Sequence, residues 1–401
     1  MTTLTITLDE PLAGASAEEF GRRIYFATAD ILDFAFVHRD DRVTAVDLTL
    51  AAGGDAAQVT RKVRSILADD VLGQLIRPPK VIWSAPAPRD VAGGTFERLV
   101  AAGEAYQAGA GQVALGPAML WLMDALDRVI CGIVVDELAG VEYRYPTLIP
   151  AATMHRCGYL SSFPQYLMFA ARLHSDLDVY RAFVADTAAA GRLVPDVLDR
   201  CAGVDLCLPP TMCYHTFQQF ADRKLPPGLD VTTARGKSFR HEEKYHRGLE
   251  RLWDFTIREV VFFGTREAVL RRRQAFLRRI LRLAEDLELT GRCEVANDPF
   301  FGNADVAARS SSQRLLELKY ELRLDVGDGR DIAIGSFNFH ERTFGLAFDI
   351  ALSDGETAHT ACAGFGLERL AYAVACQYGT DPDTWPAHLR RSLAEDSSRQ
   401  S

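Results

Sequence analysis

Long apolar runs are missing from this sequence. None approaches the ~20 residues that a membrane-spanning helix needs, so we expect no transmembrane segment. The eight cysteines include no CxxC pair, and a chain of 401 residues is too long for a small disulfide-stapled domain. The opening MTTLTITLDEPL has acidic residues but no basic ones, so we expect no signal peptide. These absences predict a cytoplasmic protein with reduced thiols.

An excess of basic residues is missing too. The chain has 45 Lys and Arg residues against 54 Asp and Glu residues, a formal net charge of −9. General nucleic-acid binders usually carry a basic face, so this balance argues against that class without excluding a local basic patch. What is present, 48% hydrophobic and 25% charged residues, is typical of a globular protein long enough for two domains.

Residues 1–100 predict a small accessory α/β domain. Helical spacing is seen over 16–36, and a second helix is expected over 56–70. Alternating or β-branched residues predict strands between and around these helices, over 3–8, 43–50 and 81–84. The unit is therefore expected to be β-α-β-α-β, and the Pro- and Gly-containing APAPRDVAGG that follows predicts a domain boundary.

A larger domain is expected over 101–390, with 391–401 as a disordered tail. Long helices are predicted over 117–132 and 265–287, and an extended segment over 141–150. From about residue 239 onward, strand-like segments dominate, interrupted by the helix over 265–287. The fold class expected from this mixture is α+β.

Three separated segments carry chemically active side chains. They are PPTMCYHTF at 209–217, the stretch 234–264 containing SFRHEEK, and GSFNFHERTFG at 335–345, which runs on to TACAGFGLERL. Taken alone, Cys213 near His215 is more often a packed core cysteine than a metal ligand. A surface Arg–Glu pair contributes little, and a Gly-Phe-Gly turn is a weak signal. Each segment alone is therefore better explained as structural.

In combination, the segments resemble the class II aminoacyl-tRNA synthetases. FRHE at 239–242 is similar to their second signature motif, and GFGLER at 364–369 is similar to their third. The resemblance implies a mostly antiparallel sheet flanked by helices, with a site for Mg-ATP. Arg240 would grip the α-phosphate in a forked geometry, and Arg369, at a helix start, would hold the γ-phosphate.

The resemblance also implies further contacts to ATP. Glu242 would accept a hydrogen bond from the adenine amino group, Phe255 would stack on the adenine ring, and Glu368 would join Arg369 at the nucleotide. Arg240, Glu242 and Arg369 are the catalytic residues it implies, because adenylate formation depends mostly on positioning and electrostatics. DIAIGSFN at 331–338 shows no obvious metal-binding glutamate of the kind many class II enzymes carry, which leaves the magnesium ligands open.

Within class II, the chain resembles the zinc-dependent seryl-tRNA synthetases of methanogens and their shortened relatives, the amino acid:carrier protein ligases. Their zinc ligands fall here on Cys213, Glu259 and Cys362. Two thiolates and a carboxylate would leave a fourth position open, which the α-amino group of the amino acid would take. Further contacts to the substrate are expected near the third motif, at Ser336, Asn338 and Gly364.

The acceptor of the activated amino acid is the open point of this resemblance. CGYLSSFPQ at 157–165, NDPFFG at 297–302 and SFNFHERTFG look like the ligases, whereas 236–264 is more similar to a seryl-tRNA synthetase. Residues 1–100 are shorter than the tRNA-binding domain of the methanogen enzymes. We therefore expect a small amino acid to pass to the phosphopantetheine thiol of a carrier protein. Aminoacylation of tRNA and a non-catalytic amino-acid-binding paralogue stay open as alternatives.

Two segments predict contacts with other chains. The helix over 265–287 has six arginines between 271 and 282. They form either an ordinary solvated face or, through Arg271, Arg272 and Arg278, a docking surface for an acidic carrier protein. Residues 117–150 resemble motif 1, through which class II catalytic domains dimerise, so we expect a homodimer.

Overall fold

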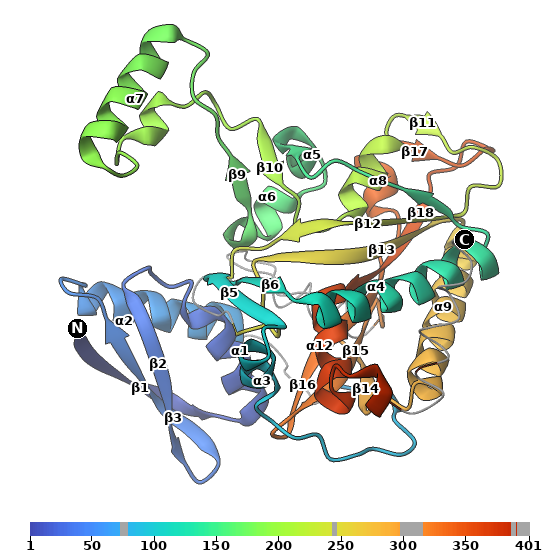
Figure 1. Cartoon of the computed structure of the whole chain (residues 1–401), viewed down its shortest axis with the longest axis horizontal. Coiled ribbons are helices and arrows are strands. Elements are labelled where there is room, and N and C mark those ends of the chain that lie inside the picture. The colour runs from blue at the N-terminus through green and yellow to red at the C-terminus, as the bar shows by residue number, and fades with distance from the viewer. Residues whose placement is uncertain (73–78, 243–246, 297–315, 386–389, 391–401) are drawn as a thin grey trace.

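The computed structural model describes residues 1–72, 79–242, 247–296 and 316–385, together with Arg390 (Figure 1). The NDPFFG segment at 297–302 and the tail at 391–401 lie outside these described residues. No helix within the described ranges is long and apolar enough to cross a lipid bilayer.

The N-terminal unit is a three-stranded antiparallel sheet, in the order β1-β3-β2, with helices packed against it. Its core contains Phe20 and Ile24 of the first helix and Val59 and Val63 of the second. The elements are β1 (Thr2–Leu12), α1 (Gly14–Ile24), β2 (Ile31–Arg39), β3 (Arg42–Leu50), α2 (Ala56–Ser65) and a π-helical turn (Ile66–Leu72).

Two predictions for this unit are wrong. The helix expected over 16–36 ends at Ile24, and after a turn the rest of that range, from Ile31, belongs to strand β2. Phe34 and Phe36 occupy alternate positions of β2 on the side that faces α1. The rings of Phe36 and Phe20 lie 6.0 Å apart. The two-residue spacing in the sequence is that of a strand. The strand at 81–84, β4 (Val81–Ser84), pairs with the large sheet instead of closing the N-terminal unit.

An eight-stranded sheet forms the centre of the remaining chain, in the order β4-β14-β15-β16-β18-β13-β12-β7. Neighbours pair antiparallel except β7 beside β12, so the expected mostly antiparallel sheet is confirmed. The strands are β7 (Val141–Tyr143), β12 (Val231–Phe239), β13 (Asp254–Gly264), β14 (Gly291–Val295), β15 (Lys319–Gly327), β16 (Arg330–Phe339) and β18 (His359–Gly366).

In the described part of the chain, one face of this sheet is covered by the helices α4 (Pro117–Gly132), α9 (Arg266–Asp286) and α12 (Leu367–Tyr378) (Figure 1). The first two confirm the helices predicted over 117–132 and 265–287. The α9 helix begins after Thr265, whose side-chain oxygen accepts a hydrogen bond from the Ala268 amide, a stabilising N-cap. Phe262, Phe276, Phe337 and Phe365 fill the core between the helices and the sheet.

The opposite face carries shorter elements around a second apolar cluster that includes Phe217, Phe263 and Phe348. The helices there are α5 (Ala151–Arg156), α6 (Tyr159–Ser162), α8 (Cys213–Gln219) and α11 (Thr343–Ala347). The small strands are β8 (Ile149–Pro150), β9 (Met168–Ala170), β10 (Leu206–Leu208), β11 (Arg223–Lys224) and β17 (Ile350–Ala351). The segment expected to be extended over 141–150 is thus divided between β7 and β8.

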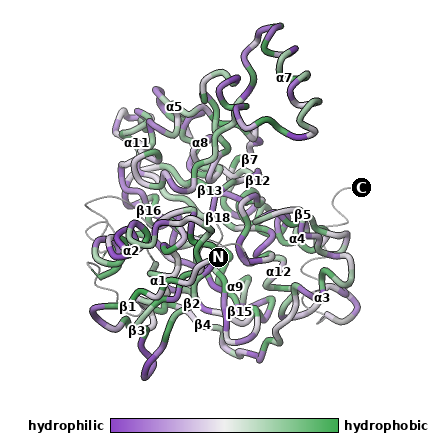
Figure 2. The backbone as a smooth tube through the Cα atoms, turned by 90° about the vertical axis from the view of Figure 1, so that its left-hand side faces the viewer, coloured by the Kyte–Doolittle hydropathy of each residue, from purple (hydrophilic) through white to green (hydrophobic). Residues whose placement is uncertain are grey.

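Two further features lie outside these layers. Helix α3 (Thr95–Ala101) leads into a hairpin of β5 (Ala105–Gly109) and β6 (Gln112–Leu115). Helix α7 (Leu177–Ala190) stands away from the rest of the chain in both views (Figures 1 and 2) and has no buried residue.

Candidate active site

A cavity of about 710 Å³ opens beside the sheet face that carries α8. Its walls come from all three chemically active segments, although these are far apart in the sequence. Every site residue predicted from the sequence lines it: Cys213, Arg240, Glu242, Phe255, Glu259, Ser336, Asn338, Cys362, Gly364, Glu368 and Arg369.

Strand register places the candidate metal and substrate residues side by side. Glu259 on β13 lies opposite Gly364 on β18, and Cys362 on β18 lies opposite Asn338 on β16. Alternate residues of a strand face the same side of a sheet, so these positions share the face that α8 covers. Cys213, the first residue of α8, completes the group.

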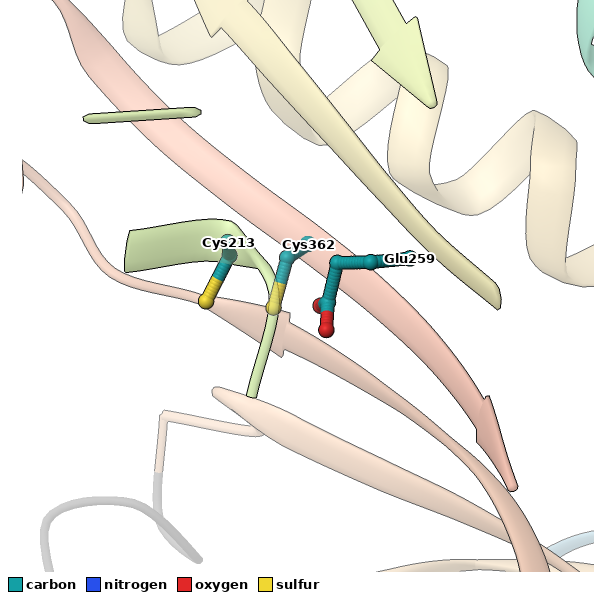
Figure 3. Close-up of side chains that lie close together, drawn as sticks. All are labelled: Cys213, Glu259 and Cys362. Atoms are coloured by element: carbon teal, nitrogen blue, oxygen red, sulfur yellow. The ribbon is translucent and has the colours of Figure 1, made fainter. Parts of the chain in front are cut away.

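The side chains of Cys213, Glu259 and Cys362 end in one small space (Figure 3). Their ligand atoms, two sulfurs and a carboxylate oxygen, all lie within 4.8 Å of one another. None of the three residues is more than 5% exposed. The sequence-predicted ligands are therefore together and shielded from water.

Burial strongly affects the protonation of this cluster. Desolvation raises the pKa of Glu259 to about 7, against the hydrogen bond that Thr211 Oγ1 donates to its carboxylate. Burial also raises the pKa of the Cys213 thiol, and the pKa of Cys362 is raised by its hydrogen bond with Cys213 and by burial. A divalent cation between the three groups would favour all their ionised forms at once. The donor set fits a thiolate-binding metal ion.

Arg240 and Phe255 lie against each other in the same cavity. Arg240 follows the last residue of β12 rather than lying within the strand, and its Nε donates to the Pro210 carbonyl oxygen at 3.1 Å. The guanidinium carbon is 5.6 Å from the centroid of the Phe255 ring. An arginine held over an aromatic ring places a cation and a stacking surface side by side, as a nucleotide requires.

A third arginine, Arg251, joins the two that the motifs predicted. Its Nη2 donates to the Glu242 carboxylate at 2.8 Å, and Glu242 is almost fully buried. Burial and the positive charges of Arg251 and Arg240 lower the pKa of Arg369 to about 10. Guanidinium groups that repel one another favour an anion between them. The Arg251 position in GLERLWDF carries no motif that would have predicted this role.

Glu368 points toward β13. Its carboxylate accepts hydrogen bonds from the Thr256 amide at 2.7 and 2.8 Å and from Thr256 Oγ1 at 2.7 Å. These bonds join the first turn of α12 to β13 and so fix the position from which the neighbouring Arg369 extends. The contact between Glu368 and ATP stays a prediction.

Glu321 supplies a carboxylate that the sequence did not indicate. It lines the cavity from β15, paired in register with Ser336 on β16, and lies 3.1 Å from Lys319 Nζ. Residues 331–338 on β16 contain no glutamate, whereas Glu321 lies on the neighbouring strand.

Known proteins resemble the chain over most of its length, although no family model matches it. Amino acid–acyl-carrier-protein ligase 1 of Bradyrhizobium diazoefficiens is 35% identical over 271 residues, which are 67% of this chain and 81% of the relative. Ligase 2 of that organism is 34% identical over 276 residues. The type-2 serine–tRNA ligase of Methanococcus aeolicus is 27% identical over 299 residues, or 72% of this chain and 56% of that protein.

Solved structures show the same fold. The seryl-tRNA synthetase of M. kandleri, solved with a tRNA of A. aeolicus, superposes with a TM-score of 0.70 at 23% identity, covering 99% of this chain and 78% of that one. The cytoplasmic serine–tRNA ligase of Naegleria fowleri with AMP gives a TM-score of 0.59 at 11% identity, covering 84% and 70%. The predicted class II synthetase fold is confirmed.

Proposed function

This chain belongs to the amino acid–acyl-carrier-protein ligase family, and from that premise we propose that it activates a small amino acid and transfers it to a carrier protein. In the first step the amino acid carboxylate attacks the α-phosphorus of ATP, and pyrophosphate leaves. In the second step the phosphopantetheine thiol of the carrier attacks the acyl carbon, and AMP leaves. The observation that carries the proposal is the single cavity that joins the Cys-Glu-Cys cluster to the arginines.

We propose that Cys213, Glu259 and Cys362 hold a zinc ion. Three protein ligands and an open position are the pattern of catalytic zinc sites. Zinc bound there would supply a Lewis acid for the α-amino group of the substrate, which would favour α-amino acids. The shared burial of the three side chains and their mutual distances support this assignment.

The amino acid pocket would lie beside this cluster, next to Ser336, Asn338 and Gly364. Asn338 Nδ2 donates to Ser336 Oγ at 3.2 Å, while its buried Oδ1 has no hydrogen-bond partner among the described residues. That oxygen is available to an N–H of the substrate. A Cβ at Gly364 would lie 3.3 Å from a carboxylate oxygen of Glu259, so a side chain there would crowd the pocket.

Arg240, Arg251 and Arg369 would stabilise the charge that develops on the phosphates. Phe255 would stack on adenine, with Glu242 within reach of the adenine amino group and Glu368 supporting Arg369 from behind. Glu321 is the candidate carboxylate for magnesium on the nucleotide, because it lines the cavity on the strand beside Ser336.

The proposal includes two surfaces that would contact other chains, one for a second copy of this chain and one for the carrier protein. We propose a homodimer formed through α4 (Leu120), the π-helical turn Ile133–Glu137 that follows it (Val135) and the edge strand β7 (Val141), where these three side chains are exposed. Carrier docking on α9 would depend on its unpaired arginines, because Arg271 and Arg272 form ion pairs with Glu267 and Asp230. We place the reaction in the cytoplasm, where the free cysteines would stay reduced.

Aminoacylation of tRNA is the second candidate, favoured by the fold likeness to a seryl-tRNA synthetase over 99% of this chain. Amino-acid-dependent ATP–pyrophosphate exchange over a panel of amino acids tests the first step, which both candidates share. We expect exchange with one or a few small amino acids. No exchange with any of them would leave the non-catalytic paralogue as the better account.

A further inference from the structure

The thiol of Cys362 has two nitrogen donors beside it in addition to the other members of the metal cluster. Asn338 Nδ2 lies 3.6 Å and His340 Nε2 lies 3.5 Å from its sulfur. Both distances suit hydrogen bonds to the large sulfur atom. Asn338 lies near the end of β16 and His340 directly follows the strand, two residues on, so they approach Cys362 from the same side.

Thr360 supports one protonation state of the His340 ring. Its Oγ1 lies 3.1 Å from His340 Nδ1 and is fully buried with its residue. A metal-bound cysteine has lost its S–H proton, so the contact at Nε2 persists only if Nε2 is the donor. Nδ1 must then accept, and the Thr360 hydroxyl donates to it. One tautomer satisfies both contacts.

Packing holds the His340 ring in this position. The ring of Phe344 crosses it at a centroid distance of 4.7 Å and that of Phe217 at 6.0 Å. The backbone is fixed as well, because the His340 amide donates to the Thr360 carbonyl oxygen at 2.9 Å. Thr360 and Cys362 occupy alternate positions of β18, so the strand that supplies the ligand also orients its donor.

We propose that His340 is a positioning residue for the metal-binding thiolate of Cys362. Its Nε2–H donates to the sulfur, and with Asn338 it draws negative charge away from the atom that coordinates the metal. Partners of this kind orient ligands and adjust metal affinity. A less electron-rich thiolate donates less charge to the metal ion, which would then accept more strongly from the α-amino group. This inference rests on the proposed metal site, and its test does not depend on turnover.

Cobalt-substituted protein gives the direct readout, because its sulfur-to-cobalt charge-transfer band reports how electron-rich the thiolates are. His340→Leu removes the donor while keeping an apolar side chain between Phe217 and Phe344. We expect the band to move to longer wavelength and the metal affinity, measured by chelator competition, to fall about 10–100-fold. His340→Gln, which can return an N–H near the Nε2 position, should recover part of both.

Two further variants make the result specific. His359→Leu removes a second histidine near the site, one that lies on β18 and stacks on Phe339, and should change neither the band nor the affinity. Thr360→Val removes the hydroxyl that donates to Nδ1 and so stabilises this tautomer, and it should shift the band in the direction of His340→Leu, but less. It also provides the test if His340→Leu does not fold.

The proposal is overturned if His340→Leu and Thr360→Val both keep the wild-type band and affinity, since His340 then only fills space. It is overturned as well if the wild-type protein binds no cobalt. Pyrophosphate exchange by the wild type is measured in parallel. If the wild type shows no exchange while His340→Leu still shifts the cobalt band, the proposed function is rejected and the role of His340 stands.

Discussion

Cys362 is the side chain on which the metal assignment depends most, because it contacts Cys213 and both nitrogen donors. Cys362→Ser keeps the shape of the residue but replaces a thiolate with a hydroxyl that stays protonated at neutral pH. We expect the variant to fold, to lose most of its zinc and to lose nearly all adenylation. Elemental analysis measures the zinc, with Cys376→Ser, a buried cysteine of α12 outside the cavity, as the control. Full zinc occupancy in Cys362→Ser would reject the assignment.

The arginines are tested by amino-acid-dependent pyrophosphate exchange. Arg240→Ala and Arg369→Ala should each reduce the rate by about 10²–10³, the usual cost of losing one charge-stabilising donor. Zinc content should stay unchanged in both, because neither residue is a ligand. Arg282→Ala, an exposed arginine of α9, serves as the control. Wild-type exchange rates in the two cavity variants would mean that ATP binds elsewhere.

The raised pKa of Glu259 predicts how the folding stability of the protein changes with pH. The direction of this change differs between metal-free and zinc-bound protein. Its pKa is raised from 4.5 to about 7, so in metal-free protein the folded state keeps a proton that the unfolded state has lost between these values. Stability contributed by this group is therefore present at low pH and lost as the pH rises through that window. Metal coordination needs the ionised carboxylate, so zinc should give its largest stabilisation at the high end.

Thermal unfolding of chelator-treated protein checks this prediction, with Glu259→Gln as the reference because it cannot ionise. The unfolding temperature of the wild type minus that of the variant should fall as the pH rises from about 5 to about 7. A difference that does not change with pH would show that Glu259 is not buried as described.

At the residue scale, the sequence was sufficient to predict the site residues that belong to motifs, and all of them line one cavity. Arg251, Glu321 and His340 were not predicted, for a physical reason. Each lies beside a partner on another strand or loop, and sequence spacing does not show which strands are neighbours. Strand register supplies that information.

Among the elements, α9 has a different surface from the one its sequence suggests. Six arginines look like one basic face, but Arg273 is buried and donates to backbone oxygens of 317 and 318, and Arg279 pairs with Glu137. Arg278 and Arg282 are exposed and have no ion-pair partner in the described part of the chain. A docking role would therefore rest on these two.

Replacing Arg278 and Arg282 with glutamate should leave pyrophosphate exchange nearly unchanged and slow aminoacyl transfer to the carrier. Steering by charge is screened by salt, so the wild-type transfer rate should fall with ionic strength while that of the variant does not. Arg271→Glu, at a position already paired with Glu267, is the matched comparison. Normal transfer by the double variant would make α9 an ordinary solvated face and direct attention to the exposed helix α7.

Long helices and the central sheet were predictable at the level of elements, whereas residues 16–36 were not. Apolar residues recur there at spacings compatible with a helix, and the change to a strand at Ile31 depends on pairing with β3. A local pattern of this kind cannot distinguish the two, because the decision is made by a partner distant in sequence.

At the level of the whole molecule, the N-terminal unit contacts the active site. Phe26, just after α1, lies edge-on to Tyr166, with ring centroids 5.9 Å apart. Tyr166 lines the cavity, and its carbonyl oxygen accepts a hydrogen bond from the His241 amide at 3.0 Å. The unit therefore supports the segment that carries Arg240 and Glu242. Its prediction as an accessory domain did not include this contact.

The most direct test of the whole account is the intact mass of a phosphopantetheinylated carrier protein after incubation with this chain, ATP and the amino acid that supports exchange. The account predicts that the carrier gains the mass of one aminoacyl group, that the gain requires the phosphopantetheine thiol, and that tRNA in a parallel reaction stays uncharged. If every carrier keeps its mass while tRNA becomes aminoacylated, the chain is a tRNA ligase and the central claim is wrong.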